Sequence, residues 1–169
     1  MSYFSNSNKN TMDIVAFTDG SCVNNGYENS TAGYAIAWPN EQFQSKGYKF
    51  KQDGVVPTNN MVEYMAAIVA IESVIHIDPD YTRHMYIYTD SQLLIDTVTK
   101  WMGTWKERGW KKRKNNRGEI KNLDLVKRLY DLTQDRTVYW GHIKAHTGMT
   151  DYFSTWNDIA DKLAQAANK

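Results

Sequence analysis

Residues 13–19, DIVAFTD, are apolar on both alternating faces, and Gly20 and Ser21 follow them at once. A strand that is apolar on both faces must be covered on both sides, so it belongs in the centre of a sheet. Gly and Ser after Asp19 mark a turn at the end of this strand. The chain therefore needs packed layers on both faces of a sheet.

The other elements follow from changes in the hydrophobic period along the chain. Three strand patterns precede any helical one, which favours an antiparallel meander with a tight turn at Asn40-Glu41. Strands then alternate with helices, which is typical of β-α-β crossovers. The strand patterns are 13–19, 32–39, 42–51, 84–90 and 137–143, and the helical ones are 60–75, 91–101, 123–132 and 157–167. We predict an α/β fold: a mixed five-stranded sheet flanked by helices, with strands one to three antiparallel and strands four and five parallel to the first.

The length of 169 residues supports one hydrophobic core. We expect a single domain over 13–169 and a disordered, Ser/Asn-rich lead over 1–12. No apolar run approaches the ~18 residues of a membrane span, and the lead lacks the apolar segment of a signal peptide. Cys22 is the single cysteine, so we expect a reducing, cytoplasmic location. A monomer without an obligate protein partner is the default expectation.

Charge is unevenly distributed along the chain. Residues 106–117 hold seven basic residues and one acidic residue, whereas the remainder holds 13 basic and 18 acidic residues. A basic patch on a mildly acidic body is typical of a protein that binds a polyanion. Trp101, Trp105 and Trp110 lead into this patch, and the first two are spaced to share one helix face. We expect them to form a small satellite core beneath a charged arm.

Acidic side chains occupy positions that the predicted topology brings together. Asp19 and Asp90 each end a strand, and the carboxyl ends of parallel strands collect reactive groups in α/β sheets. Glu63 is expected in the first turn of the helix that begins near Asn60, close to the same edge, and Asp161 on the last helix. Buried carboxylates repel each other unless a cation compensates them. Hard divalent ions with oxygen ligands do so, and two of them promote phosphoryl displacement.

Each acidic residue taken alone also has a simpler interpretation. An Asp before Gly or Ser commonly forms a turn. Glu63 alone fits a carboxylate near a helix start, and Asp161 alone a solvated helix residue. Their joint placement at one sheet edge is what favours a metal site.

Four ordered motifs and a basic segment resemble the type 1 ribonuclease H family over roughly residues 13–168. The motifs are FTDGS (17–21), TNNMVE (58–63), YTDSQ (88–92) and AHTG followed by NDIAD (145–161). The segment 101–121, in WMGTWKERGWKKRKNNRGEIK, is similar to that family's basic protrusion. The resemblance implies a ribonuclease H-like fold and a stand-alone catalytic domain.

The resemblance also implies roles for particular residues. His146 corresponds to a loop histidine that assists proton transfer or product release, which suits a pKa near neutrality. The interval from His146 to Asp161 is longer than the family pattern, with an apparent insertion at 151–155. Asp158 is therefore a rival to Asp161 as fourth ligand, and we prefer Asp161 because it matches the last acidic position of the motif. The implied metal ligands are Asp19, Glu63, Asp90 and Asp161.

Hybrid-binding positions carry over in the same way. The amide side chains suit the RNA 2′-hydroxyl, which separates RNA from DNA, because amides both donate and accept hydrogen bonds. Asn59 and Asn60 also fit simple helix capping. Thr58 matches a pocket for a DNA-strand phosphate, and Cys22 lies beside the groove. The implied set is Cys22, Asn25, Thr58, Asn59, Asn60, Gln92, Trp101, Lys111, Lys112, Arg113 and Lys114.

The expected activity is that of an endonuclease which hydrolyses the RNA strand of RNA–DNA hybrids. Two Mg²⁺ ions, for which Mn²⁺ can substitute, are the implied cofactors, and 5′-phosphate and 3′-hydroxyl ends the implied products. Two rivals remain: a DNA nuclease of the resolvase or transposase type on the same fold, and a hybrid-binding module without catalysis. The 2′-hydroxyl-reading residues argue against the first, and the complete set of carboxylates argues against the second.

Overall fold

A computed structural model describes residues 12–113, 118–145, 148 and 150–169. Its sheet has five strands in the order β3-β2-β1-β4-β5. β1 pairs antiparallel with β2 and parallel with β4, and β5 is parallel to β4. The predicted mixed sheet is therefore confirmed. The strands are β1 (Ile14–Val23), β2 (Thr31–Ala37), β3 (Lys46–Lys49), β4 (Met85–Thr89) and β5 (Val138–His142).

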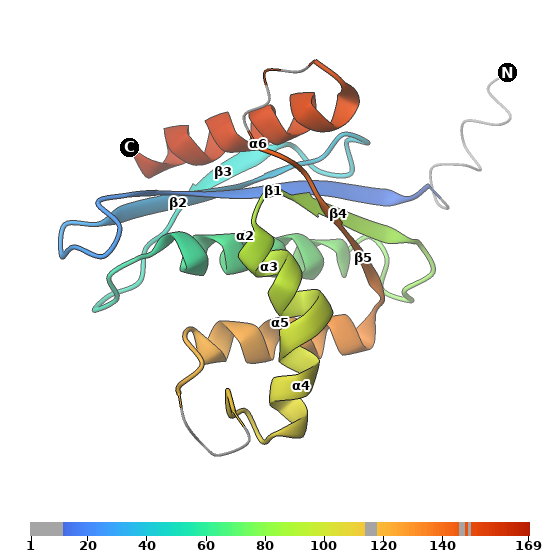
Figure 1. The fold of residues 1–169 in the computed structure, drawn as a ribbon. Coiled ribbons are helices and arrows are strands. Elements are labelled where there is room, and N and C mark those ends of the chain that lie inside the picture. Colours follow the sequence, from blue (N-terminus) through green and yellow to red (C-terminus); the bar gives the residue numbers. More distant parts are fainter. Residues whose placement is uncertain (1–11, 114–117, 146–147, 149) are drawn as a thin grey trace, which may run out of the picture.

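Helices cover both faces of the sheet (Figure 1). α2 (Asn59–Val74) packs against β1 and β2 on one face, and α5 (Leu123–Asp135) packs behind α2. α6 (Tyr152–Asn168) covers β1, β2 and β3 on the opposite face. The central strand β1 is thus enclosed on both sides, as its apolar sequence predicts: Ile14, Ala16 and Phe17 are fully buried.

α6 lies unusually close to the sheet because two strand residues are glycines. A Cβ atom on Gly47 would lie 2.4 Å from the Leu163 carbonyl oxygen, and one on Gly33 would lie 2.8 Å from the Ala164 carbonyl oxygen. Both distances are shorter than a side chain permits, so any larger residue would push α6 outward. The apparent insertion at 151–155 becomes the start of α6, where the Asp151 side chain caps the helix by accepting from the Ser154 N–H.

Three observed elements differ from the sequence-based prediction. The first strand does not end in a turn after Asp19: β1 continues through Gly20 and Ser21 to Val23, because these residues pair with β2. The pattern over 42–51 yields only the four-residue edge strand β3. The helix predicted over 91–101 continues as α3 (Gln92–Asp96), the π-helical turn η1 (Thr97–Trp101) and α4 (Met102–Glu107). Apolar spacing does not register a π-turn, since one extra residue per turn leaves the overall pattern helical.

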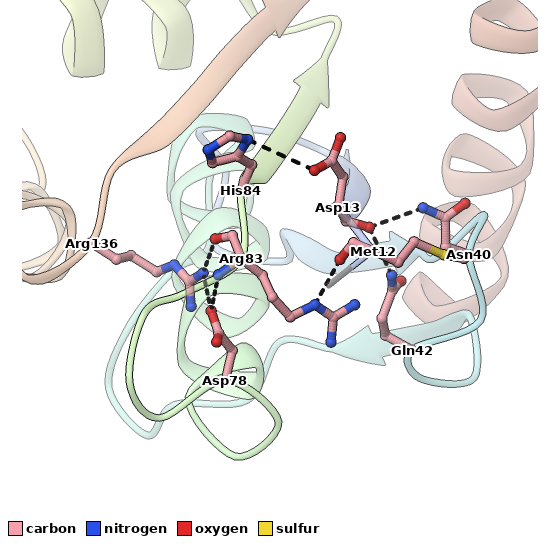
Figure 2. Close-up of polar contacts among 8 residues, drawn as sticks. All are labelled: Met12, Asp13, Asn40, Gln42, Asp78, Arg83, His84 and Arg136. Carbon is pink, nitrogen blue, oxygen red and sulfur yellow. Dashed lines mark hydrogen bonds and ion pairs between the residues drawn. The ribbon is translucent and has the colours of Figure 1, made fainter. Parts of the chain in front are cut away.

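A polar network closes the sheet at the amino-terminal ends of β1 and β4 (Figure 2). Asp78 and Arg136 are 3% and 4% exposed, and their side chains form an ion pair at 2.8 Å. The backbone N–H groups of Thr82 and Arg83 also donate to the Asp78 carboxylate. Through these contacts the end of α2, the approach to β4 and the end of α5 are joined.

The same end of the sheet is held by the main chain of Asp13. Asn40 and Gln42 donate side-chain hydrogen bonds to the Asp13 carbonyl oxygen at 3.0 and 3.1 Å (Figure 2). This contact fixes the turn predicted at Asn40-Glu41, in which Glu41 has a φ of 56°.

Among the described residues, no helix is long and apolar enough to cross a membrane.

Candidate active site

Three carboxylates meet at the carboxyl edge of the two central parallel strands. Asp19 lies on β1, Asp90 follows β4 and Glu63 comes from α2. One oxygen from each lies within 4.8 Å of the other two. We call these three residues the carboxylate cluster. The sequence-based prediction that they converge is in agreement with this geometry.

The local structure explains the convergence. Thr18 on β1 pairs with Thr89 on β4, so the next residue of each strand emerges at the same edge. A Cβ on Gly20 would lie 2.7 Å from the Val62 Cγ2 atom, so only glycine lets α2 approach β1 this closely. The Gly20 N–H then donates to the Glu63 Oε1 atom at 3.2 Å.

The position of Glu63 in its helix corrects one expectation. Thr58 is the N-cap of α2, and the first turn of the helix contains no acidic residue. Glu63 therefore lies in the second turn, where the helix dipole contributes little. The prediction placed the helix start near Asn60, whereas Thr58 and its bond from the Met61 N–H begin the helix earlier.

The cluster is electrostatically unfavourable without a cation. Burial, together with the charges of Glu63, Asp90 and Asp161, raises the pKa of Asp19 far above the ordinary carboxylate value. Burial and the charge of Asp90 likewise raise the pKa of Glu63, although its hydrogen bonds with Asp19 and Gly20 partly oppose this. No basic side chain is among the main causes of either shift. The cluster must therefore bind protons or a cation to remain buried.

The donor set fits a hard divalent ion. All the converging groups are carboxylates, and the Glu63 Oε2 atom is buried without a hydrogen-bond partner in the part of the chain that the structure describes. Hard ions such as Mg²⁺ and Mn²⁺ prefer oxygen ligands of this kind. A cation would neutralise the repulsion and give the orphaned oxygen a partner.

The structure separates the two candidates for a fourth carboxylate. The Asp161 side chain helps to raise the pKa of Asp19, which indicates that it lies nearby, and its Oδ2 atom accepts from the Gln165 amide at 3.0 Å. Asp158 is exposed and forms an ion pair with Lys162 at 2.8 Å. Asp161 therefore adjoins the cluster, whereas Asp158 is engaged at the surface of α6.

Two contacts to Asp90 were not predicted from the sequence. The Asn157 Nδ2 atom donates to the Asp90 Oδ2 atom at 3.4 Å, and His142 Nε2 lies 3.3 Å from the Asp90 carbonyl oxygen. Asn157 opens the NDIAD motif, and that position was the only available signal. His142 matched no motif.

Several residues expected to bind a hybrid lie near the start of α2 or within α3. The Asn25 side chain accepts from the Asn59 N–H at 3.1 Å, which joins the β1–β2 loop to the start of α2. Cys22 Sγ lies 3.1 Å from the Ser30 hydroxyl, beside the same loop. Gln92 donates to Asp96 within α3. These side chains lie on or next to α2, which carries Glu63, and α3, which begins just after Asp90.

Aromatic and basic residues line a cavity of about 580 Å³ beside α4. Trp101 and Trp105 pack with ring centroids 5.8 Å apart, and Asn60, Lys112 and Arg113 also line this cavity. Lys111 is exposed and directly precedes Lys112 in the sequence. Lys114 and His146 lie outside the described residues.

The tryptophans do not form the separate satellite core that was predicted. Trp105 and Trp110 pack against the main hydrophobic core. The Trp110 ring meets the Tyr130 ring edge-on at 5.5 Å, and the Lys127 Nζ atom lies over the Trp110 ring, 5.8 Å from its centroid. The spacing of the tryptophans predicted the packing of Trp101 on Trp105 but not that α5 would be the partner of Trp110.

This sheet order, with a partly buried carboxylate cluster at the carboxyl edge of β1 and β4, defines the class of ribonuclease H-like hydrolases. Comparison with known proteins agrees. A family model for RNase H matches residues 11–169. The ribonuclease H of Maricaulis maris (strain MCS10) is 36% identical over 152 residues, which cover 90% of this chain and 91% of the relative. That of Enterobacter sp. (strain 638) is 35% identical over 93% of this chain and 90% of its own length.

Solved structures share the fold. The PFV RNase H domain has a TM-score of 0.72 at 22% identity, covering 94% of this chain and 95% of that domain. LC11-RNase H1, solved in complex with an RNA/DNA hybrid, has a TM-score of 0.63 at 19% identity, covering 92% and 96%. The chain belongs to the ribonuclease H family of hydrolases.

Proposed function

We propose that this chain is an endonuclease that hydrolyses the RNA strand of RNA–DNA hybrids with two Mg²⁺ ions. Mn²⁺ can replace them, and the products carry 5′-phosphate and 3′-hydroxyl ends. The observation that carries the proposal is the partly buried carboxylate cluster, in which the main neighbours of Asp19 are other carboxylates. Two findings support the choice of substrate. The relatives are named ribonuclease H, and a structure of the same fold was solved in complex with an RNA/DNA hybrid.

The carboxylates have distinct places in this proposal. Asp19, Glu63 and Asp90 hold the ions, and Asp161 adds a fourth carboxylate from α6. When bound, two such ions activate water and stabilise the attacking and leaving oxygens of an in-line displacement. Gly20 fixes Glu63 through its backbone N–H. His146 moves a proton between solvent and the leaving group.

Recognition of RNA rests on the amide side chains near the cluster. Asn25, Asn59, Asn60 and Gln92 are proposed to contact the minor groove and the 2′-hydroxyl groups, which only RNA offers. Thr58 contributes to a pocket for a DNA-strand phosphate, and Cys22 borders the groove. The Asn25–Asn59 hydrogen bond supports this, because it places two of the proposed readers side by side.

The basic protrusion (101–121) is proposed to bind phosphates without sequence preference. Lys111, Lys112, Arg113 and Lys114 supply the charge, while Trp101 borders the cavity. Replacing Lys111, Lys112 and Arg113 by Gln should weaken hybrid binding and lower the slope of log K against log salt by roughly one for each lysine or arginine that binds a phosphate. A slope equal to that of the unmodified protein would exclude phosphate binding by these side chains.

Hydrolysis itself is tested with a hybrid whose two strands carry different labels. The protein should cut the RNA strand in the presence of Mg²⁺, leave the DNA strand intact and stop when a chelator is added. End analysis should find 5′-phosphates. Cleavage of the DNA strand, or of an all-DNA duplex at a similar rate, would instead support the resolvase-type alternative.

A further inference from the structure

We propose that Asn157 is a positioning residue, which holds the Asp90 carboxylate in the orientation that cation binding requires. This inference rests on the proposed function, because it concerns the same site. Asn157 is 5% exposed and lies on the face of α6 that is turned to the sheet, together with Ala160 and Ala164. Its Nδ2 atom donates to the Asp90 Oδ2 atom at 3.4 Å.

Asp90 is held at two separate points. His142, at the end of β5, places its Nε2 atom 3.3 Å from the Asp90 carbonyl oxygen, which restrains the main chain. Asn157 restrains the carboxylate from α6, which covers one face of the sheet. With one carboxylate oxygen bonded to the amide, the side chain has a preferred rotation, and the other oxygen is directed without competition from this bond.

The chemistry of an amide suits this position. Asp19 and Glu63 already gather negative charge around Asp90. A cationic donor such as Lys would neutralise Asp90 and compete with a metal ion. A carboxylate at this position would repel the Asp90 carboxylate. A neutral amide donates a hydrogen bond without changing the net charge, so the cluster keeps its full charge for a cation. Partners of this type, which orient the direct ligands, commonly change metal affinity by 10–100-fold when removed.

Aromatic contacts hold the start of α6 against the sheet. Phe153 packs edge-on against Tyr88 at 5.0 Å, and Tyr152 packs against Phe17 at 5.9 Å. Tyr88 is two residues before Asp90. These contacts come from the apparent insertion at 151–155, which therefore fastens the amino-terminal end of α6 to the two strands that carry Asp19 and Asp90.

α6 also supplies a matched control. Asn168 is likewise 5% exposed, donates from its Nδ2 atom at 3.4 Å, and has a buried Oδ1 atom without a partner among the described residues, as Asn157 has. Its acceptor, however, is the Ser21 hydroxyl rather than a carboxylate of the cluster. The two asparagines thus share burial and hydrogen bonding, and they differ in what they hold.

The test compares Asn157→Ala with Asn168→Ala in the full chain. Mg²⁺ binding is measured by titration calorimetry without nucleic acid, and kcat and KM are measured on a labelled hybrid. Asn157→Ala should raise the Mg²⁺ Kd and the half-saturating Mg²⁺ concentration by about 10–100-fold, lower kcat at fixed Mg²⁺ and leave KM for the hybrid unchanged. Asn168→Ala should leave Mg²⁺ binding as in the unmodified protein.

Two further variants separate positioning from loss of structure. Asn157→Ser keeps a hydroxyl donor and should recover part of the Mg²⁺ affinity, whereas Asn157→Asp, which is almost isosteric, should change the pH dependence of Mg²⁺ binding. If Asn157→Ala does not fold, this pair decides the matter by the same calorimetric readout.

The possible failures are distinguishable. Equal Mg²⁺ affinities for the Asn157 variants and Asn168→Ala would overturn the positioning role while hybrid cleavage stands. If the unmodified protein binds no Mg²⁺ and cuts no hybrid, the proposed function fails first.

Discussion

Two aspartates at opposite ends of the central strands are equally buried and electrostatically opposite. Asp19 and Asp78 are each 3% exposed. Although burial opposes it, hydrogen bonds from Arg83, Thr82 and Arg136 lower the pKa of Asp78. Burial and neighbouring carboxylates raise the pKa of Asp19. The fold itself compensates the charge of Asp78, whereas the charge of Asp19 has to be compensated from outside the chain.

The comparison shows what distinguishes a structural charge from a functional one. Asp78 receives two backbone N–H donors and a buried guanidinium, so its ionised form is part of the folded state. The neighbours of Asp19 are other carboxylates, whereas those of Asp78 are hydrogen-bond donors. Burial alone therefore does not indicate the role of an acidic residue, whereas the sign of its neighbours does.

The largest expected effect is on catalysis, at the uncompensated end. Asp19→Asn should reduce hybrid cleavage to background, because it removes a ligand of the proposed metal site, while hybrid binding remains measurable by fluorescence anisotropy. Without divalent ions the variant should be at least as stable as the unmodified protein, since one source of repulsion is gone. Near-native cleavage by this variant would show that the metal site is assigned wrongly.

At the compensated end the expected effect is on stability. Asp78→Ala leaves the Arg136 guanidinium buried and unpaired, which costs roughly 3–5 kcal/mol for a broken buried ion pair. Urea unfolding measures this loss, and the folded fraction should keep its kcat. The double variant Asp78→Ala/Arg136→Met should recover part of the stability; if it is no better than the single variant, the cost does not come from the stranded charge.

The two ends should also respond oppositely to pH. The folded pKa of Asp19 is raised, so above pH ~4 the folded state keeps a proton that the unfolded state releases. Stability therefore falls as the pH rises from ~4 to the folded pKa of Asp19. The folded pKa of Asp78 is lowered, so its contribution is present above ~4 and is lost as pH falls below it. Thermal unfolding in chelator should show both slopes.

Added Mg²⁺ and the Asp19→Asn change should each flatten the slope on the alkaline side and leave the acid side unaffected. Asp19→Asn should leave a smaller slope, because burial also raises the pKa of Glu63. An alkaline slope as steep as that of the unmodified protein would show that Asp19 does not cause it.

The smallest effect concerns an aspartate that is neither buried nor part of the cluster. Asp158→Ala breaks an exposed i,i+4 ion pair with Lys162, and such surface pairs contribute little to stability. Its Mg²⁺ affinity should equal that of the unmodified protein, whereas Asp161→Ala should bind Mg²⁺ more weakly. The reverse ranking in titration calorimetry would make Asp158 the fourth ligand.

Much of the site was predictable because it depends on local signals. Asp19 and Asp90 follow strand patterns directly, and parallel pairing of those strands brings the two residues to one edge whatever the details of the loops. The strand directions were predicted from the order in which strand and helix patterns follow each other along the chain. The resemblance in motifs then selected Asp161 over Asp158, and the exposed pairing of Asp158 with Lys162 agrees with that choice.

The features that were missed depend on tertiary contacts. Asp78 and Arg136 are 58 residues apart, and nothing near either residue indicates that they pair. The bond from Asn157 to Asp90 spans 67 residues and requires α6 to sit at one height above the sheet. The π-turn η1 was missed for a different reason, since a single extra residue leaves the apolar pattern helical.

The close seat of α6 on Gly33 and Gly47 has a consequence for how the protein is made. α6 carries Asp161 and Asn157, and it packs mainly against β1, β2 and β3, whose residues precede it by more than one hundred positions. The hydrogen bond between Asn168 and Ser21, for example, spans 147 positions. Contacts of such long range form late in folding. A nascent chain on the ribosome thus exposes Asp19, Glu63 and Asp90 without their α6 neighbours. The proposed catalytic centre becomes complete only when the final helix has been synthesised and has docked.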